Sequence, residues 1–186
     1  MRRTDPLDLE LSLPLEAAPA EAGFVPGSFR EIVAAHQSRV FSIAFHALRN
    51  RAQAEDVAQE VFLRLSSRLD TIQSEAHLVA WLRRVTARLC IDELRRPARN
   101  APSLEGVAEP GEAAEPGDPF LSAHLRRLLA DLPGPARLAL ILRYQEDLEP
   151  QEIAAVLNEP VPTIKSRLAR GLQRLRDGLK HLGVEA

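Results

Sequence analysis

Two predicted helices joined by a tight turn, in residues 149–179, constrain the fold of this chain most strongly. The first helix is short and carries Ile153 and Ala154 on one side. Asn158 tolerates the left-handed conformation that ends a helix, and Pro160 cannot continue that helix but can begin another. We therefore expect a helix-turn-helix here.

The second of these helices has one apolar and one polar side. Its apolar residues recur at helical spacing; they are Ile164, Leu168, Leu172, Leu175 and Leu179. The opposite side is mostly basic or polar: Thr163, Ser166, Arg167, Arg170, Gln173 and Arg174. A short helix, a turn and a longer basic helix are typical of units that bind the DNA major groove. The alternative, an ordinary helical hairpin with a solvated charged face, is disfavoured by the turn chemistry.

Composition favours an all-helical, intracellular protein. The 186 residues are 45% apolar and only 4% aromatic, with alanine, leucine and arginine prominent. Cys90 is the single cysteine, which excludes an intramolecular disulfide and suits a reducing cytoplasm. Acidic residues and prolines interrupt residues 1–23, so we expect neither a signal peptide nor membrane insertion. The predicted location is the cytoplasm.

The net charge of −2 conceals an uneven distribution. Residues 82–100 contain six arginines against two acids, and residues 160–186 contain six basic residues against two acids. Residues 101–119 contain five acids and no base. Two basic zones separated by an acidic one are more informative than the overall charge.

The sequence divides into four predicted segments. Residues 1–27 form a mobile arm, and residues 98–120 form an acidic, flexible linker rich in Pro, Gly, Ala and Glu. Between and after them we expect two small helical domains, 28–97 and 121–186. The helices expected from apolar periodicity, besides the helix-turn-helix, are 28–50, 52–68, 75–96, 124–131 and 135–146. Ser28 and Ser74 are predicted N-caps.

One side of the second predicted helix combines three polar side chains with a leucine: Asp56, Gln59, Glu60 and Leu63. Charges alone would indicate a solvated face. An exposed leucine ringed by acids instead resembles a small protein-docking patch.

The third predicted helix carries a row of arginines, Arg84, Arg88 and Arg95, with Trp81 at its border. An aromatic ring beside arginines suits single-stranded or melted nucleic acid, in which bases stack and phosphates need neutralising. A core position for Trp81 is an alternative of nearly equal weight.

No pattern in the chain predicts a catalytic site, a cofactor or a metal. The five histidines are scattered without an HExxH pair or a Cys/His cluster, and no glycine-rich phosphate loop is present. Cys90 stands between Leu89 and Ile91, so a buried structural role is expected. We therefore predict a binding protein and not an enzyme.

Three segments in order resemble a bacterial sigma factor of the extracytoplasmic-function (ECF) group, within the sigma-70 family. AEDVAQEVFLRL (54–65) is similar to the family's D-x-x-Q-[DE]-x-F segment of region 2, and AWLRRVTARLCIDELRR (80–96) to its region 2.3–2.4 helix. Residues 132–176 are similar to region 4. The resemblance covers nearly all of residues 28–181 except the linker.

The resemblance implies a promoter-specificity subunit of RNA polymerase with promoter DNA and the polymerase core as partners. The patch Asp56, Gln59, Glu60 and Leu63 would bind the coiled coil of the β′ subunit. Loop 69–76 and the arginine helix would contact the −10 element through Ile72, Trp81, Arg84, Arg88, Arg95 and Arg96. The second domain would contact the β flap. Its second helix would contact the −35 element through Thr163, Lys165, Ser166, Arg167, Ala169, Arg170 and Arg174.

Further expectations follow from the family. Relatives are often held inactive by an anti-sigma factor, which would clamp between the two domains. The family usually has glycine where Asn158 and Pro162 stand here. A stand-alone helix-turn-helix regulator and a protein-interaction adaptor with a sigma-like fold are the alternative functions. The promoter sequence and the inducing signal are not encoded in any recognisable pattern.

Overall fold

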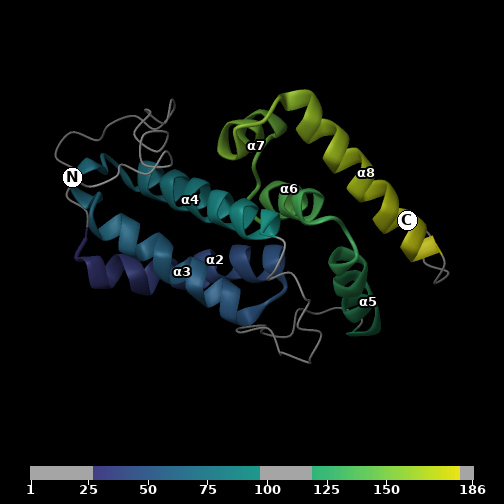
Figure 1. Cartoon of the computed structure of the whole chain (residues 1–186), viewed down its shortest axis with the longest axis horizontal. Coiled ribbons are helices and arrows are strands. Elements are labelled where there is room, and N and C mark those ends of the chain that lie inside the picture. Colours follow the sequence, from purple (N-terminus) through teal and green to yellow (C-terminus); the bar gives the residue numbers. More distant parts are fainter. Residues whose placement is uncertain (1–26, 97–118, 181–186) are drawn as a thin grey trace.

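The computed structural model describes residues 27–96 and 119–180, and these residues form an all-helical fold without a strand (Figure 1). The elements are α2 (Phe29–Leu48), α3 (Arg51–Ser66), the short 3-10 helix η1 (Leu69–Thr71), α4 (Glu75–Arg95), α5 (Pro119–Ala130), α6 (Gly134–Tyr144), α7 (Pro150–Leu157) and α8 (Val161–Lys180). The predicted all-α class is confirmed. The predicted arm up to residue 26 and the acidic linker from 98 to 118 lie outside the described residues.

Side-chain caps begin the helices where the sequence predicts them. Ser28 and Glu31 form a reciprocal capping box at the start of α2, and the Ser74 hydroxyl accepts from the His77 N–H at the start of α4. Most predicted helix ends differ from the structure by no more than two residues, and the largest difference is at the start of α5. Helix α5 begins at Pro119 rather than at 124, because proline is well tolerated in the first turn of a helix, where its missing N–H is not needed.

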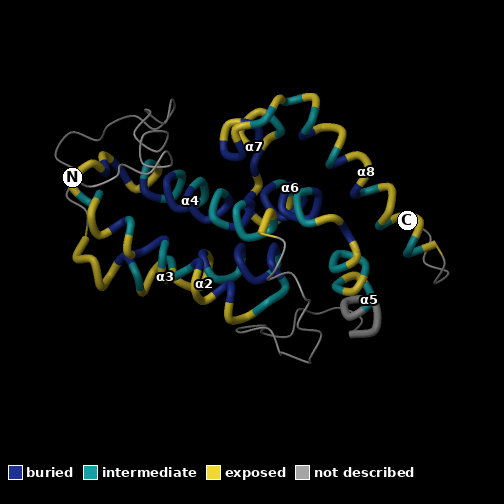
Figure 2. The backbone as a smooth tube through the Cα atoms, viewed as in Figure 1, coloured by how far each residue is buried: buried dark blue, intermediate teal, exposed yellow. Residues whose placement is uncertain are grey.

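Helices α2, α3 and α4 form a bundle around one apolar core (Figures 1 and 2). The most deeply buried large side chains of this part are Val40, Ile43, Val61, Leu65, Leu78, Leu82 and Val85. Their three-four spacing places them on the inner face of each helix, shown dark blue in Figure 2. The outer faces of α3 and α4 are thereby fixed in orientation.

Helix α6 is central to the rest of the molecule. The run from Leu138 to Leu142 is buried throughout, as its apolar composition predicts. This helix packs against α8 on one side and against α2 and α4 on the other. Residues of both predicted domains therefore belong to a single apolar core, a contact that the sequence did not predict.

Candidate nucleic-acid and protein interfaces

The turn between α7 and α8 has the conformation that Asn158 predicts. Asn158 has φ 52° and ψ 51°, in the left-handed region, and its N–H donates to the Ala154 carbonyl. Ile153 and Ile164 are fully buried on either side of the turn. Pro162 lies in the first turn of α8, which proline tolerates. This packing fixes the direction of α8 relative to α7.

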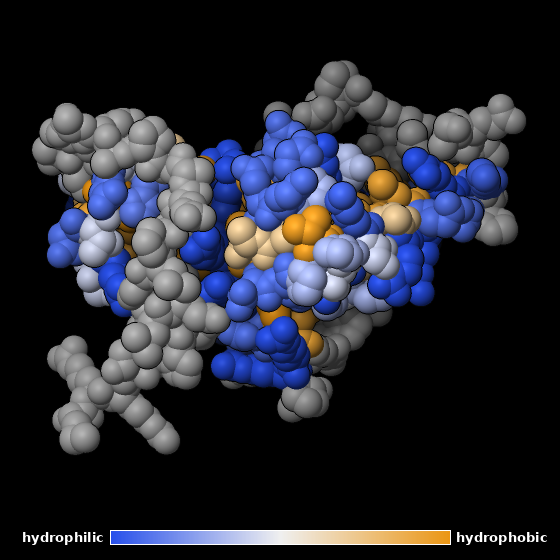
Figure 3. Space-filling model, turned by 90° about the horizontal axis from the view of Figure 1, so that it is seen from above, coloured by the Kyte–Doolittle hydropathy of each residue, from blue (hydrophilic) through white to orange (hydrophobic). Residues whose placement is uncertain are grey.

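The outer face of α8 presents most of the residues predicted for the −35 element. Five of the seven are exposed: Lys165, Ser166, Ala169, Arg170 and Arg174. The Arg170 Nε donates to the Ser166 carbonyl at 3.3 Å, which holds the guanidinium along the helix surface. In Figure 3, which views the molecule from above Figure 1, hydrophilic residues cover most of the described surface. Exposed cationic and hydroxyl side chains on one helix face can donate to phosphates and base edges.

The other two predicted residues of this set are less accessible. Thr163 is half-buried. Arg167 forms a 2.6 Å ion pair with Glu159, and both side chains are largely buried, at 22% and 16% exposure. This ion pair ties α8 to the turn that precedes it, so Arg167 has a clear structural role. Its contact with DNA stays a prediction.

The four residues predicted to bind the polymerase core lie together on the outside of α3. Asp56 and Gln59 are exposed, and Leu63, 66% exposed, lies beside them on the same helix face. Glu60 is accessible as well, and it accepts from the Arg64 Nε at 2.7 Å. The combination of an apolar projection with flanking acids fits a basic and apolar partner surface.

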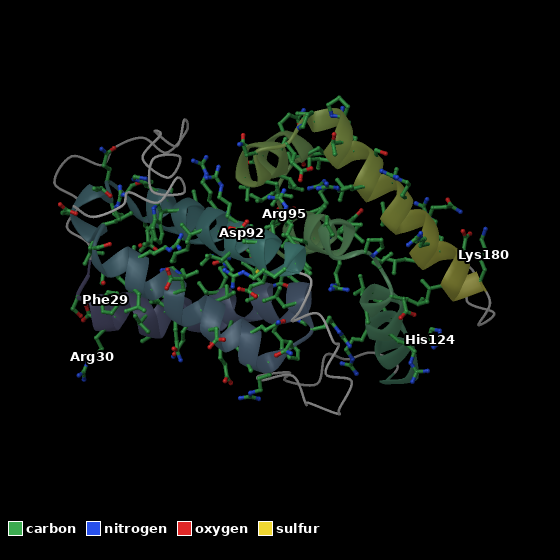
Figure 4. The ribbon with its side chains drawn as sticks, in the orientation of Figure 1. Phe29, Arg30, Asp92, Arg95, His124 and Lys180 are labelled. Carbon is green, nitrogen blue, oxygen red and sulfur yellow. The ribbon has the colours of Figure 1, made fainter. Side chains whose placement is uncertain are left out.

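The arginines of α4 form a second cationic surface. Arg95 and Arg96 are exposed, whereas Arg84 and Arg88 are half-buried. Burial lowers the pKa of Arg84 below its ordinary value, and the positive charge of Arg88 lowers it further. The buried Nε of Arg84 has no hydrogen-bond partner in this part of the chain. Figure 4 shows Arg95 near the C-terminal end of α4, beside Asp92. An anion at this helix would relieve the repulsion between the paired cations.

Ile72 and Trp81 are both 5% exposed, so neither presents its side chain to a partner in this structure. The sequence allowed two positions for Trp81, on a stacking surface or in the apolar core, and the structure places it in the core. The Cys90 thiol is also fully buried, which raises its pKa, as the structural interpretation of this residue requires. Contacts of Ile72 and Trp81 with the −10 element stay predictions, and they would require these side chains to leave the core.

Arg137 and Glu146 join the two predicted domains, and sequence reasoning did not single them out. Arg137 lies in α6 and donates to the Ala47 carbonyl of α2 from both Nε and Nη2, at 3.0 and 2.6 Å. The Glu146 carboxylate is nearly inaccessible and accepts from the Arg83 Nε at 2.6 Å, with the Arg39 Nε at 3.3 Å. The sequence does contain one indication of this role: Arg137 directly precedes the apolar run 138–142, and a charge buried there needs a partner.

The predicted faces lie on separate helices, α3, α4 and α8 (Figure 1). Among residues 27–96 and 119–180, no group of three or more His, Cys, Asp or Glu side chains is placed to hold a metal ion. In the same ranges no helix is long and apolar enough to cross a membrane. The geometry is that of several binding surfaces.

Two family models match the chain in the order of its two helical parts. The model of Sigma-70 region 2 matches residues 32–100, and the model of Sigma-70, region 4 matches residues 123–175. The first match contains α3 and α4, and the second contains α6, α7 and most of α8. Together they span most of the chain, including all of the exposed residues described above.

Curated relatives and solved structures agree with the family models. The ECF RNA polymerase sigma factor SigW of Bacillus subtilis is 28% identical over 169 residues, covering 83% of this chain and 90% of that protein. The ECF RNA polymerase sigma factor SigE of Mycolicibacterium smegmatis is 35% identical over 164 residues, covering 83% of this chain and 63% of that protein. The fold is similar to that of the sigma factor RpoE in its complex with the anti-sigma factor NepR from Bartonella quintana. That structure has a TM-score of 0.63 and 22% identity, and the match covers 82% of this chain and 96% of that one.

Proposed function

The chain belongs to the sigma-70 family as a sigma factor of the ECF group, and on that premise we propose how its surfaces divide the work of promoter recognition. The outer face of α3 binds the polymerase core at the β′ coiled coil. The arginines of α4 contact the −10 element, and the outer face of α8 contacts the −35 element. The chain supplies specificity, and the chemistry belongs to the polymerase.

The observation that carries this proposal is that one acidic face and two cationic faces lie on three separate helices. The α3 face is acidic with one projecting leucine, whereas the α4 and α8 faces are cationic. Opposite charges on different helices suit different partners, because an acidic face repels DNA and a basic face attracts it. A stand-alone DNA-binding regulator needs the α8 face alone. Such a function gives no reason for the exposed leucine, Leu63, on the acidic α3 face.

The two cationic faces would act together once the polymerase core fixes their spacing. Each face alone offers few contacts, and phosphate contacts give affinity that falls steeply with salt. Joining two weak sites makes the second binding event intramolecular and raises the overall affinity without new contacts. Arg137 and Glu146 bond directly to the first domain and so hold the two domains together. If the two promoter elements lie farther apart than α4 and α8, these bonds must break and the domains must separate.

The test is binding of purified polymerase core to the Asp56→Arg variant. The matched control is Asp70→Arg, which makes the same charge change at another exposed position of the same domain. We expect Asp56→Arg to weaken core binding at least tenfold, because it places a cation where the partner is expected to be basic. The control should bind like the unchanged chain. Equal binding by all three proteins would refute the assignment of the α3 face.

A further inference from the structure

An apolar groove between α2 and α3 remains unfilled by the described residues. It encloses about 970 Å³, and its floor and walls include Phe29, Phe41, Phe45 and Phe62. The chain has six phenylalanines, so most of them gather at this one groove. Phe29 is 39% exposed, at the N-terminal end of α2 (Figure 4). Phe29 and Leu63 are the exposed apolar side chains of this lining, and the buried rings of Phe45 and Phe62 lie beneath; an apolar groove with exposed apolar side chains suits an apolar occupant.

The rim of the groove is weakly cationic. Arg51 lies 6.0 Å from the centre of the Phe41 ring and pairs with Glu55 at 2.8 Å. Arg126 of α5 lines the groove as well. The charged side chains of the lining therefore include two arginines and one glutamate, and an occupant with both apolar and acidic side chains can meet them.

The part of the chain before Gly27 contains a segment with that chemistry. In LDLELSLPLE, residues 7–16, every odd position from 7 to 15 is leucine, and the positions between them include Asp8 and Glu10. Five leucines and three acids within ten residues match an apolar groove with a cationic rim. A segment of this composition without a binding surface would leave all five leucines in water.

The length of the chain allows this segment to reach the groove. The described residues begin at Gly27, and Phe29, two residues later, lines the groove. Leu15 and Gly27 are twelve positions apart, and this stretch spans up to about 40 Å when extended. Helix α2 has 20 residues and is about 30 Å long. Any point along the groove is therefore within reach.

We propose that residues 7–15 bind in the α2–α3 groove, with their leucines against the phenylalanines and their acids at the arginine rim. Gln59 and Leu63 line the same groove. The bound segment therefore covers half of the four-residue face predicted to bind the polymerase core, a consequence that rests on the proposed function. Binding of the core and binding of the segment exclude one another.

A spin label tests the docking without the polymerase. The full chain with Thr4→Cys carries a nitroxide outside the leucine segment, and the buried Cys90 stays unlabelled. In NMR spectra we expect strong broadening of the signals of Val33, Phe62 and Leu63, and little broadening of Lys165 and Arg170 on α8. Similar broadening at both places, or at neither, would overturn the proposal.

A matched variant with Leu9→Ser, Leu11→Ser and Leu13→Ser separates docking from mere tethering. It keeps the length and charge of the segment, and the groove signals should recover to at least half of their unlabelled intensity. Unchanged broadening in this variant would overturn the assignment to the leucines. Polymerase core should bind the serine variant several-fold more tightly than the unchanged chain, and equal affinities would overturn the covering of the core-binding face. Failure of both proteins to bind core would refute the proposed function, while the NMR result would still decide the docking.

Discussion

Replacing Arg137 with alanine should destabilise the whole fold, because its guanidinium connects the two helical parts. Arg137 is buried, with 7% of its surface exposed. It donates twice to the Ala47 carbonyl at the C-terminal end of α2. Its Nη1 also donates to the Ala130 and Leu132 carbonyls, at 2.9 and 3.1 Å. Alanine would leave three carbonyls near the end of two helices without these donors.

The magnitude follows from two opposing effects. A hydrogen bond from a charged donor contributes roughly 1.5–3 kcal/mol net, and three acceptors lose such a donor. Against this, burial and the nearby charge of Arg49 lower the pKa of Arg137 to about 10, so the cation is itself costly to bury. That cost is about 3 kcal/mol. Water entering the vacated space also restores part of the lost bonding. We expect a net loss of about 3 kcal/mol in the free energy of unfolding.

Urea denaturation followed by far-UV circular dichroism measures this loss. Arg137→Lys should lose less, about 1–2 kcal/mol, because an ammonium keeps the charge but lacks the planar fork that reaches carbonyls on both sides. Arg127→Ala, at an exposed position of α5, is the matched control and should change stability by less than about 0.5 kcal/mol. A loss below about 1 kcal/mol for Arg137→Ala would refute the argument that this side chain connects the two parts.

Three further predictions concern the other surfaces. Arg170→Ala should weaken binding of the polymerase-bound chain to −35 DNA by about 1–3 kcal/mol and relax sequence preference. Arg176→Ala, at another exposed position of α8, should weaken binding to all sequences alike and reduce its salt dependence. An equal loss of sequence preference in the two variants, measured by gel-shift titration, would contradict the assigned face. Asn158→Ala should cost about 1 kcal/mol of stability and Asn158→Gly less, because the left-handed backbone penalises a Cβ but not glycine; equal losses in urea would show that the amide contacts dominate. Burial lowers the pKa of His77, and the charge of Arg84 lowers it further, so the unfolded chain binds this proton more tightly. The stability from His77 is therefore full above about pH 6.5 and declines as the pH falls toward the lower folded pKa. The melting temperature of His77→Gln should fall less between pH 7 and pH 5 than that of the unchanged chain. An equal fall in both proteins would contradict this.

The local features of the fold were predictable because each depends on neighbours in sequence. Ser28 and Ser74 bond to backbone three residues away, and Asn158 closes α7 through its own conformation. The face of α8 follows from helical spacing alone. The exposed set Asp56, Gln59 and Leu63 was likewise found from periodicity, because the buried side of α3 determines which side faces outward.

The contact between the two parts was not predictable in the same way. Arg137 and Ala47 are 90 positions apart, and Arg83 and Glu146 are 63 apart. No local pattern says which distant carbonyl a buried guanidinium will meet. Trp81 shows the same limit, because a side chain at the border of an apolar stripe turns inward or outward according to what packs over it. The closed arrangement of the two parts is therefore a tertiary property. It is held by the apolar core that both parts share and by the buried bonds of Arg137 and Glu146, so substitutions at these two residues should weaken the contact between the parts without changing any residue predicted to touch DNA.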